Sequence, residues 1–73
     1  MNRLRVVRAE KRMTQFRLGI ATRIIQSRLS LIENGLIEPQ NNEKEKISKA
    51  LGVKPEDIWN GDEIENQIQK IAV

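Results

Sequence analysis

The chain lacks both cysteine and histidine, and no apolar run approaches the length of a membrane span. Without cysteine there is no disulfide framework, and without either residue type the common zinc sites are excluded. Only carboxylates and lysine remain for acid–base or nucleophilic chemistry, so we expect no enzyme, no metal and no cofactor. The 73 residues suffice for one small domain, which must rely on efficient helix packing or on dimerisation.

The N-terminal arginines are not followed by the apolar core of a signal peptide. A membrane-spanning helix needs about 20 apolar residues, and the chain has no such run. We therefore expect a soluble, cytoplasmic protein without a membrane partner.

The positive charge is concentrated in the first half of the chain. Residues 1–37 carry eight basic and two acidic residues, whereas residues 38–73 carry five basic and eight acidic residues. Seven of the eight bases in the first half are arginine, whose planar fork suits phosphate and guanine. This asymmetry favours one surface that faces a polyanion such as nucleic acid, with ordinary surface charge as the alternative.

Apolar spacing and cap residues predict an all-α chain with five short helices and no strand. Thr14 is an expected N-cap, and Asn34-Gly35 is an expected helix end. The expected helices span residues 2–12, 15–22, 26–34 and 42–51, and a fifth helix opens at Pro55 and stops at Asn60-Gly61.

The last segment repeats isoleucine at helical spacing, at Ile64, Ile68 and Ile71. We therefore divide the chain into a domain over residues 1–60 and a tail helix over residues 61–73. The tail either packs back on the domain or forms a dimer seam, because an exposed apolar stripe would not stay unpaired.

Helices 15–22 and 26–34, separated by a three-residue turn, make a helix-turn-helix over residues 15–34. Such a motif places the first turn of its second helix against base edges in the major groove. Gln26 can pair with adenine, Arg28 with guanine, and Ser27 with several partners. Leu31 either contacts thymine methyl groups or is a minor packing residue. The N-terminus of the first helix, at Thr14 and Gln15, is expected to meet phosphate.

The motif also carries a resemblance to a family, because several of its residues stand in a known order and spacing. These are Thr14-Gln15, Leu18, Gln26-Ser27, Ser30, Ile32-Glu33-Asn34-Gly35, Pro39 and Ala50-Leu51-Gly52-Val53. In this pattern the chain resembles the Cro/lambda-repressor-like helix-turn-helix family, also called XRE-type, over residues 4–59. The resemblance implies a compact bundle of four or five helices that binds operator DNA as a dimer on two half-sites.

The resemblance also implies roles for single residues. It implies an internal ion pair between Arg8 and Glu33, and Glu33 is the only acid between Lys11 and Glu38. It implies that Gln15 clamps phosphate and supports Gln26. The expected phosphate contacts are Thr14, Gln15, Arg17, Arg23 and Asn34.

Three positions depart from the family pattern. Gly19 occupies a position where a small residue is usual, and it loosens its helix relative to alanine. Arg23 occupies a turn position where glycine is favoured, so a left-handed backbone there would be strained. Ile25 replaces the usual capping serine or threonine, and we expect it to pack. Phe16 and Trp59 are expected in or at the edge of the core.

These observations predict a sequence-specific regulator of transcription that binds double-stranded DNA. We expect a repressor that acts as a homodimer on a palindromic operator. The alternative is an antitoxin-like or other protein-interaction module on the same fold, with a protein partner.

Overall fold

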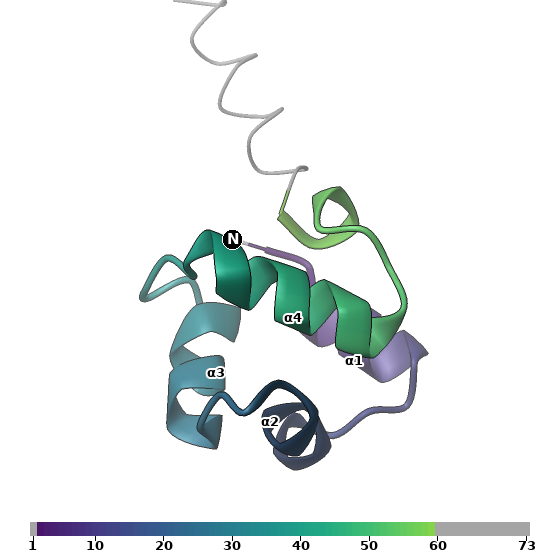
Figure 1. Cartoon of the computed structure of the whole chain (residues 1–73), viewed down its shortest axis with the longest axis horizontal. Helices are drawn as coiled ribbons and strands as arrows, with labels where there is room; N and C mark the ends of the chain where they lie inside the picture. The colour runs from purple at the N-terminus through teal and green to yellow at the C-terminus, as the bar shows by residue number, and fades with distance from the viewer. Residues whose placement is uncertain (1, 60–73) are drawn as a thin grey trace, which may run out of the picture.

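The computed structural model describes residues 2–59 and consists of helices joined by short loops. The helices are α1 (Leu4–Glu10), α2 (Gln15–Thr22), α3 (Gln26–Glu33) and α4 (Asn41–Leu51) (Figure 1). Residues 56–59 form a fifth, short helical segment, and no strand occurs between residues 2 and 59. The predicted all-α class is therefore confirmed. The tail over residues 61–73 lies outside the described residues, and its packing or dimer role stays a prediction.

The predicted helix boundaries agree closely except for the first helix, which is shorter than residues 2–12. It begins after Asn2, whose Oδ1 accepts a hydrogen bond from the Leu4 N–H at 3.0 Å. The Asn2 side-chain amide also donates to the carbonyl oxygen of Ile32 at 2.7 Å, so the start of the chain is tied to α3. The helix ends before Arg12, which adopts a left-handed φ of 54°.

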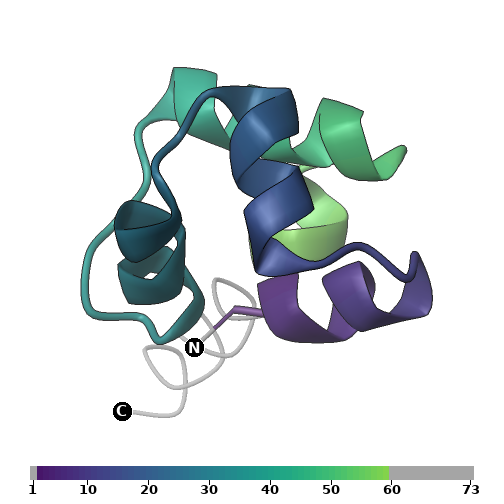
Figure 2. The same ribbon diagram turned by 90° about the horizontal axis from the view of Figure 1, so that it is seen from below.

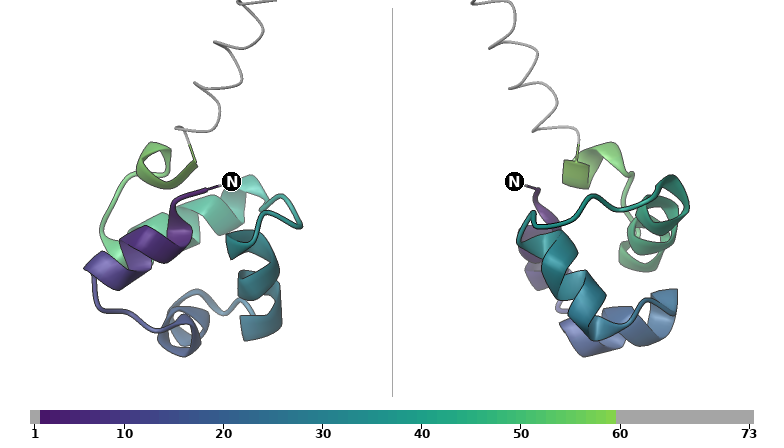
Figure 3. Two further views of the ribbon diagram at one scale, coloured as in Figure 1. Left: turned by 180° about the vertical axis from the view of Figure 1, so that it is seen from behind. Right: turned by 90° about the vertical axis from the view of Figure 1, so that its left-hand side faces the viewer.

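The helices surround one apolar core, in which α2 packs against both α3 and α4. Figures 1 and 2 place α3 at an outer edge of the domain, and the right view of Figure 3 shows it nearest to the viewer, in front of α1. The recognition candidate is therefore a peripheral helix held by its inner face. The core comprises Leu4, Val7, Leu18, Ile24, Leu29, Ile32, Ile47, Leu51, Ile58 and Trp59.

Trp59 is buried in this core, in agreement with the prediction that it lies in the core or at its edge. The Nζ atom of Lys44 lies 5.7 Å from the centroid of its ring, a distance that suits a cation–π contact. The backbone N–H of Arg3 donates to the carbonyl oxygen of Ile58 at 2.9 Å, which joins the start of the domain to this segment.

None of the helices between residues 2 and 59 combines the length and the apolarity that a membrane crossing requires.

Candidate nucleic-acid interface

The start of α2 is fixed by Thr14, the predicted N-cap. Its hydroxyl oxygen accepts a hydrogen bond from the backbone N–H of Arg17 at 3.1 Å. A threonine cap satisfies one of the donors that the first turn of a helix leaves unpaired. Gln15 is thereby placed at the first helical position, as the sequence predicted.

The turn between α2 and α3 is tightly constrained. Arg23 adopts a left-handed backbone with a φ of 60°. This is the conformation that the sequence analysis described as strained for a residue other than glycine. The buried hydroxyl of Thr22 donates to the Leu18 carbonyl oxygen at 2.7 Å and accepts from the Ile24 N–H at 3.3 Å. These bonds and the burial of Ile24 hold the angle between the two helices.

The third helix presents a narrow buried face and a broad exposed one. Leu29, Ile32 and Glu33 are buried. Ser27 and Leu31 lie one helical turn apart on the opposite side and are exposed, as is Gln26. The first turn of α3 is therefore uncovered by the rest of the described chain, as base reading requires.

Glu33, the last residue of α3, is buried, and its side chain is only 1% exposed. Its Oε2 lies 2.7 Å from Nε of Arg8, and its Oε1 accepts from Nη2 of the same arginine at 3.1 Å. Burial, the largest single influence, raises the pKa of Glu33, but the hydrogen bonds from Arg8 and Gln15 and the charge of Arg8 outweigh it. The net pKa is lowered, so Glu33 stays ionised and its charge is neutralised inside the fold.

A chain of side-chain hydrogen bonds runs from Glu33 to the surface. The Gln15 amide nitrogen donates to Oε2 of Glu33 at 3.3 Å. The Gln26 amide nitrogen in turn donates to Oε1 of Gln15, also at 3.3 Å. Because each bond uses only one amide hydrogen, Gln26 retains one donor and its oxygen for a base, and Gln15 retains one donor. The support of Gln26 by Gln15 is the arrangement that the resemblance implied.

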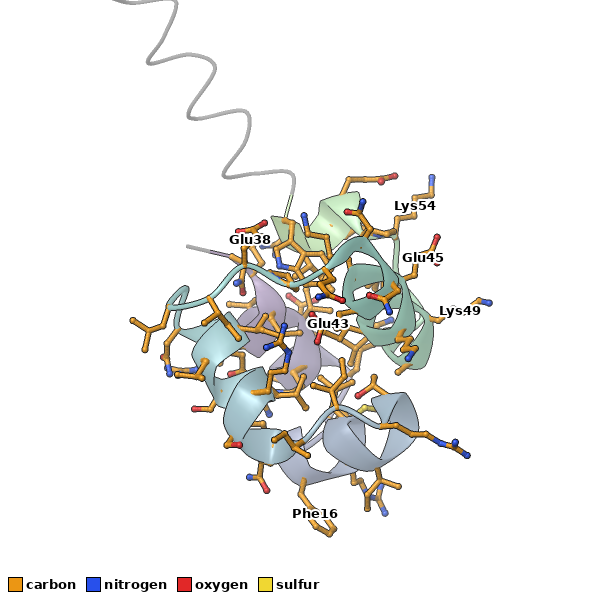
Figure 4. All side chains as sticks on the ribbon, turned by 60° about the vertical axis from the view of Figure 1, so that its left-hand side comes forward. Phe16, Glu38, Glu43, Glu45, Lys49 and Lys54 are labelled. Atoms are coloured by element: carbon orange, nitrogen blue, oxygen red, sulfur yellow. The ribbon has the colours of Figure 1, made fainter. Side chains whose placement is uncertain are left out.

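Arg28 lies at the other edge of the exposed face and forms an ion pair with α4. Its Nε and Nη2 donate to the Glu43 carboxylate at 2.5 and 2.9 Å. Figure 4 shows Glu43 directed from α4 toward α3. The Arg28 side chain is 37% exposed, so it belongs to the surface, and Glu43 engages two of its five N–H donors.

Glu43 is a residue of the site that sequence reasoning did not single out. The hydrogen bond from Arg28 is the main reason that its pKa is lowered to about 2, against a smaller opposing effect of burial. The Gln40 backbone N–H, at 2.8 Å, also stabilises the carboxylate. The signal available in the sequence was a glutamate three residues after Gln40, the spacing of a capping box, which marks a helix start but not a partner on another helix.

Apart from Thr14 and Gln15 at the start of α2, the expected phosphate-contacting residues fall into two groups. Arg17 and Arg23 are exposed, and no acid between residues 2 and 59 forms a salt bridge with either. Asn34 is exposed but already engaged, since its Oδ1 accepts from Nη2 of Arg5 at 3.2 Å and its Nδ2 donates to the Ser30 carbonyl at 2.9 Å. The two arginines are thus the readiest phosphate ligands.

Two apolar residues are placed differently from expectation. Phe16 was expected in or near the core but is 62% exposed, and Figure 4 shows it pointing away from the domain. The reason is helical phase, because α2 buries only the stripe of Leu18 and Thr22, and Phe16 lies about 200° around the helix from Leu18. Ile25 was expected to pack but is 71% exposed, and it begins α3 without a side-chain cap.

A capped helix, a constrained turn and a second helix with an uncovered first turn define the helix-turn-helix class of DNA-binding domains. The sequence model of the Cro/C1-type HTH DNA-binding domain matches residues 3–60, which is most of the chain. The chain therefore belongs to this family, also called XRE. Membership implies DNA binding, and the family is typically non-catalytic. No curated protein and no solved structure matches the chain significantly.

Proposed function

We propose that this protein is a transcriptional repressor that recognises a specific double-stranded operator through the exposed side of α3. The observation that carries the proposal is the exposed first turn of α3, where the Gln26 and Ser27 side chains face solvent while Leu29 and Ile32 are buried beneath them. Gln26, Ser27 and Leu31 contact bases. Arg28 contacts a base through the N–H donors that Glu43 does not use, in a direction that the ion pair fixes.

Phosphate contacts set the position of the domain on the duplex. Arg17 and Arg23 supply charge, and Thr14, Gln15 and Asn34 supply further polar contacts around α2 and the end of α3. Such contacts make affinity depend steeply on salt, because each neutralised phosphate releases counterions. In this arrangement the protein blocks a promoter by occupying it, as a homodimer on a palindromic operator.

A titration of labelled duplex at several salt concentrations tests the proposal. Arg17→Ala should reduce the slope of log affinity against log salt by about 0.9, the loss of one phosphate contact. Lys54→Ala removes the same charge at a distant place, since Figure 4 shows Lys54 and Phe16 at opposite ends of the domain. The control should leave the slope unchanged, and an equal loss in both variants would contradict the proposed orientation.

Selection of bound sequences from a random duplex pool tests the specificity and the symmetry. A palindromic consensus with half-sites about one helical turn, roughly 34–36 Å, apart would match a two-fold dimer. If the bound duplexes shared no common sequence, the protein would be a nonspecific DNA binder.

A second function, a protein-interaction module of the antitoxin kind, is favoured by a separate observation. Phe16, Ile20 and Ile25 are all exposed and line one shallow depression beside the α2–α3 turn. Exposed apolar residues that gather in one place are a common mark of protein contact sites. Absence of salt-sensitive retention on duplex DNA or heparin would favour this function over operator binding.

A further inference from the structure

The exposed side of α3 carries one aliphatic residue, and a second lies directly before the helix. Leu31 is 40% exposed one helical turn after Ser27, and Ile25, directly before the helix, is 71% exposed. Isolated exposed aliphatic residues are ordinary on a protein surface. Here, however, they stand beside Gln26 and Ser27, the two uncharged polar residues that the proposed function assigns to bases.

The only charged side chain at the start of this helix is held to one edge. Arg28 gives two hydrogen bonds to Glu43, whose carboxylate also accepts from the Gln40 N–H. The carboxylate, itself anchored at the start of α4, therefore fixes the direction of the guanidinium, and a guanine contact is limited to the three N–H donors that Glu43 does not use. The remaining residues of the exposed side offer one amide, one hydroxyl and two aliphatic groups.

The major groove presents few features that aliphatic groups can recognise. Thymine carries a C5-methyl group there, whereas guanine, cytosine and adenine present hydrogen-bonding groups. A glutamine amide, with one donor and one acceptor, pairs best with the N7 and N6 groups of adenine. Both kinds of residue on this helix thus fit A·T pairs better than G·C pairs.

We propose, resting on the proposed function, that the operator half-site has an A·T core which the protein recognises through contact of Leu31 and Ile25 with thymine C5-methyl groups. Gln26 reads the adenine of a neighbouring pair. The Arg28–Glu43 ion pair holds the guanidinium toward α4, at the edge of this contact.

Replacement of thymine by uracil tests the proposal, because uracil lacks only the C5-methyl group and pairs with adenine in the same way. The operator is first selected from a random duplex pool and then resynthesised with uracil at one thymine at a time. At each contacted position the parent protein should bind the uracil duplex about fourfold more weakly, the value of one buried methyl group.

Variants of the two aliphatic residues assign each effect. Leu31→Ala should bind the thymine and uracil duplexes equally at one position, and Ile25→Ala should do so at another. Both residues are exposed, so the variants are expected to fold. Leu36→Ala is the matched control, since Leu36 is 69% exposed in the loop after α3 and should leave the thymine-to-uracil ratio unchanged.

The outcomes separate the two proposals. A consensus without thymine in its core, or equal binding of thymine and uracil duplexes at every position, overturns the methyl contact and leaves operator binding intact. A uracil effect that persists in both Leu31→Ala and Ile25→Ala also overturns it. Failure to retain any duplex in a salt-sensitive way overturns the proposed function itself.

Discussion

Arg28 in α3 and Glu43 in α4 are joined by two hydrogen bonds, at 2.5 and 2.9 Å. The pair links the edge of the candidate recognition helix to the first turn of α4. It therefore has two roles that can be measured separately. It links two helices of the fold, and it fixes the direction of an exposed guanidinium.

The first prediction concerns the pH dependence of stability. The pKa of Glu43 is lowered from 4.5 to about 2, so its ionised form is favoured in the folded state. Stability from this pair is complete above pH 4.5 and is lost as the pH falls from 4.5 to about 2. Urea unfolding at a series of pH values should show Glu43→Gln less stable than the parent at pH 6, with the difference vanishing near pH 2. A constant difference across this range would contradict the prediction.

The second prediction concerns base preference. Glu43→Gln removes the charge that fixes the direction of the Arg28 guanidinium, so the guanidinium can turn and place two donors on guanine O6 and N7. The variant should gain a guanine preference of roughly 1–3 kcal/mol at one position of the half-site. Comparison of selected consensus sequences for the parent and the variant measures it. The double variant with Arg28→Ala is the control and should lose the new preference.

The third prediction concerns the buried ion pair of Arg8 and Glu33. Arg8→Leu leaves the Glu33 carboxylate buried without its main partner and should cost about 3–5 kcal/mol of unfolding free energy. Arg5→Ala removes a second, exposed arginine from the same carboxylate and should cost less than about 1 kcal/mol. Urea denaturation at pH 7 measures both, and equal costs would show that burial does not govern this site.

The fourth prediction concerns the packing of α2 on the turn. A Cβ atom at Gly19 would lie 3.0 Å from the Ile24 carbonyl oxygen and 3.6 Å from Cδ1 of Leu29. Gly19→Val should therefore destabilise the fold by roughly 1–3 kcal/mol, the usual cost of overpacking. Ala21→Val, at an exposed position of the same helix, is the control and should cost only a few tenths of a kcal/mol in helix propensity. Thermal unfolding of the two variants decides whether close approach at residue 19 matters.

The fifth prediction separates backbone strain from phosphate contact. Arg12 and Arg23 both adopt a left-handed backbone, with φ of 54° and 60°. Replacing either by glycine relieves strain of about 1 kcal/mol, partly offset by the greater freedom of the unfolded chain, so both variants should melt slightly higher. Only Arg23→Gly should also weaken DNA binding and reduce its salt slope. Equal effects on DNA would mean that Arg23 contributes general charge alone.

The helices were predictable because their signals are local. Thr14 caps α2 by a bond to a residue three positions away, and Gly35 with a φ of 73° follows the end of α3, so neither signal depends on the rest of the fold. The resemblance supplied the pairing of Arg8 with Glu33, which no local pattern specifies.

The edges of the site were less predictable because they depend on which helix faces are covered. Phe16 looked like a core residue because it is aromatic, yet the packing of α2 selects the stripe of Leu18 and Thr22. Arg28 was assigned to guanine because of its donors, but Glu43 reaches it from a helix fifteen positions onward. Whether two side chains on different helices pair with each other depends on how the helices pack. A single sequence does not determine that packing.

The Arg28–Glu43 pair also bears on attempts to transplant binding preference between proteins of this architecture. A graft of residues 25–34 into another scaffold would carry Arg28 but leave its acid behind. In the same ten residues the guanidinium, whose direction Glu43 fixes here, would then turn freely, and the hybrid would favour a different target. A faithful transplant has to include the first turn of α4.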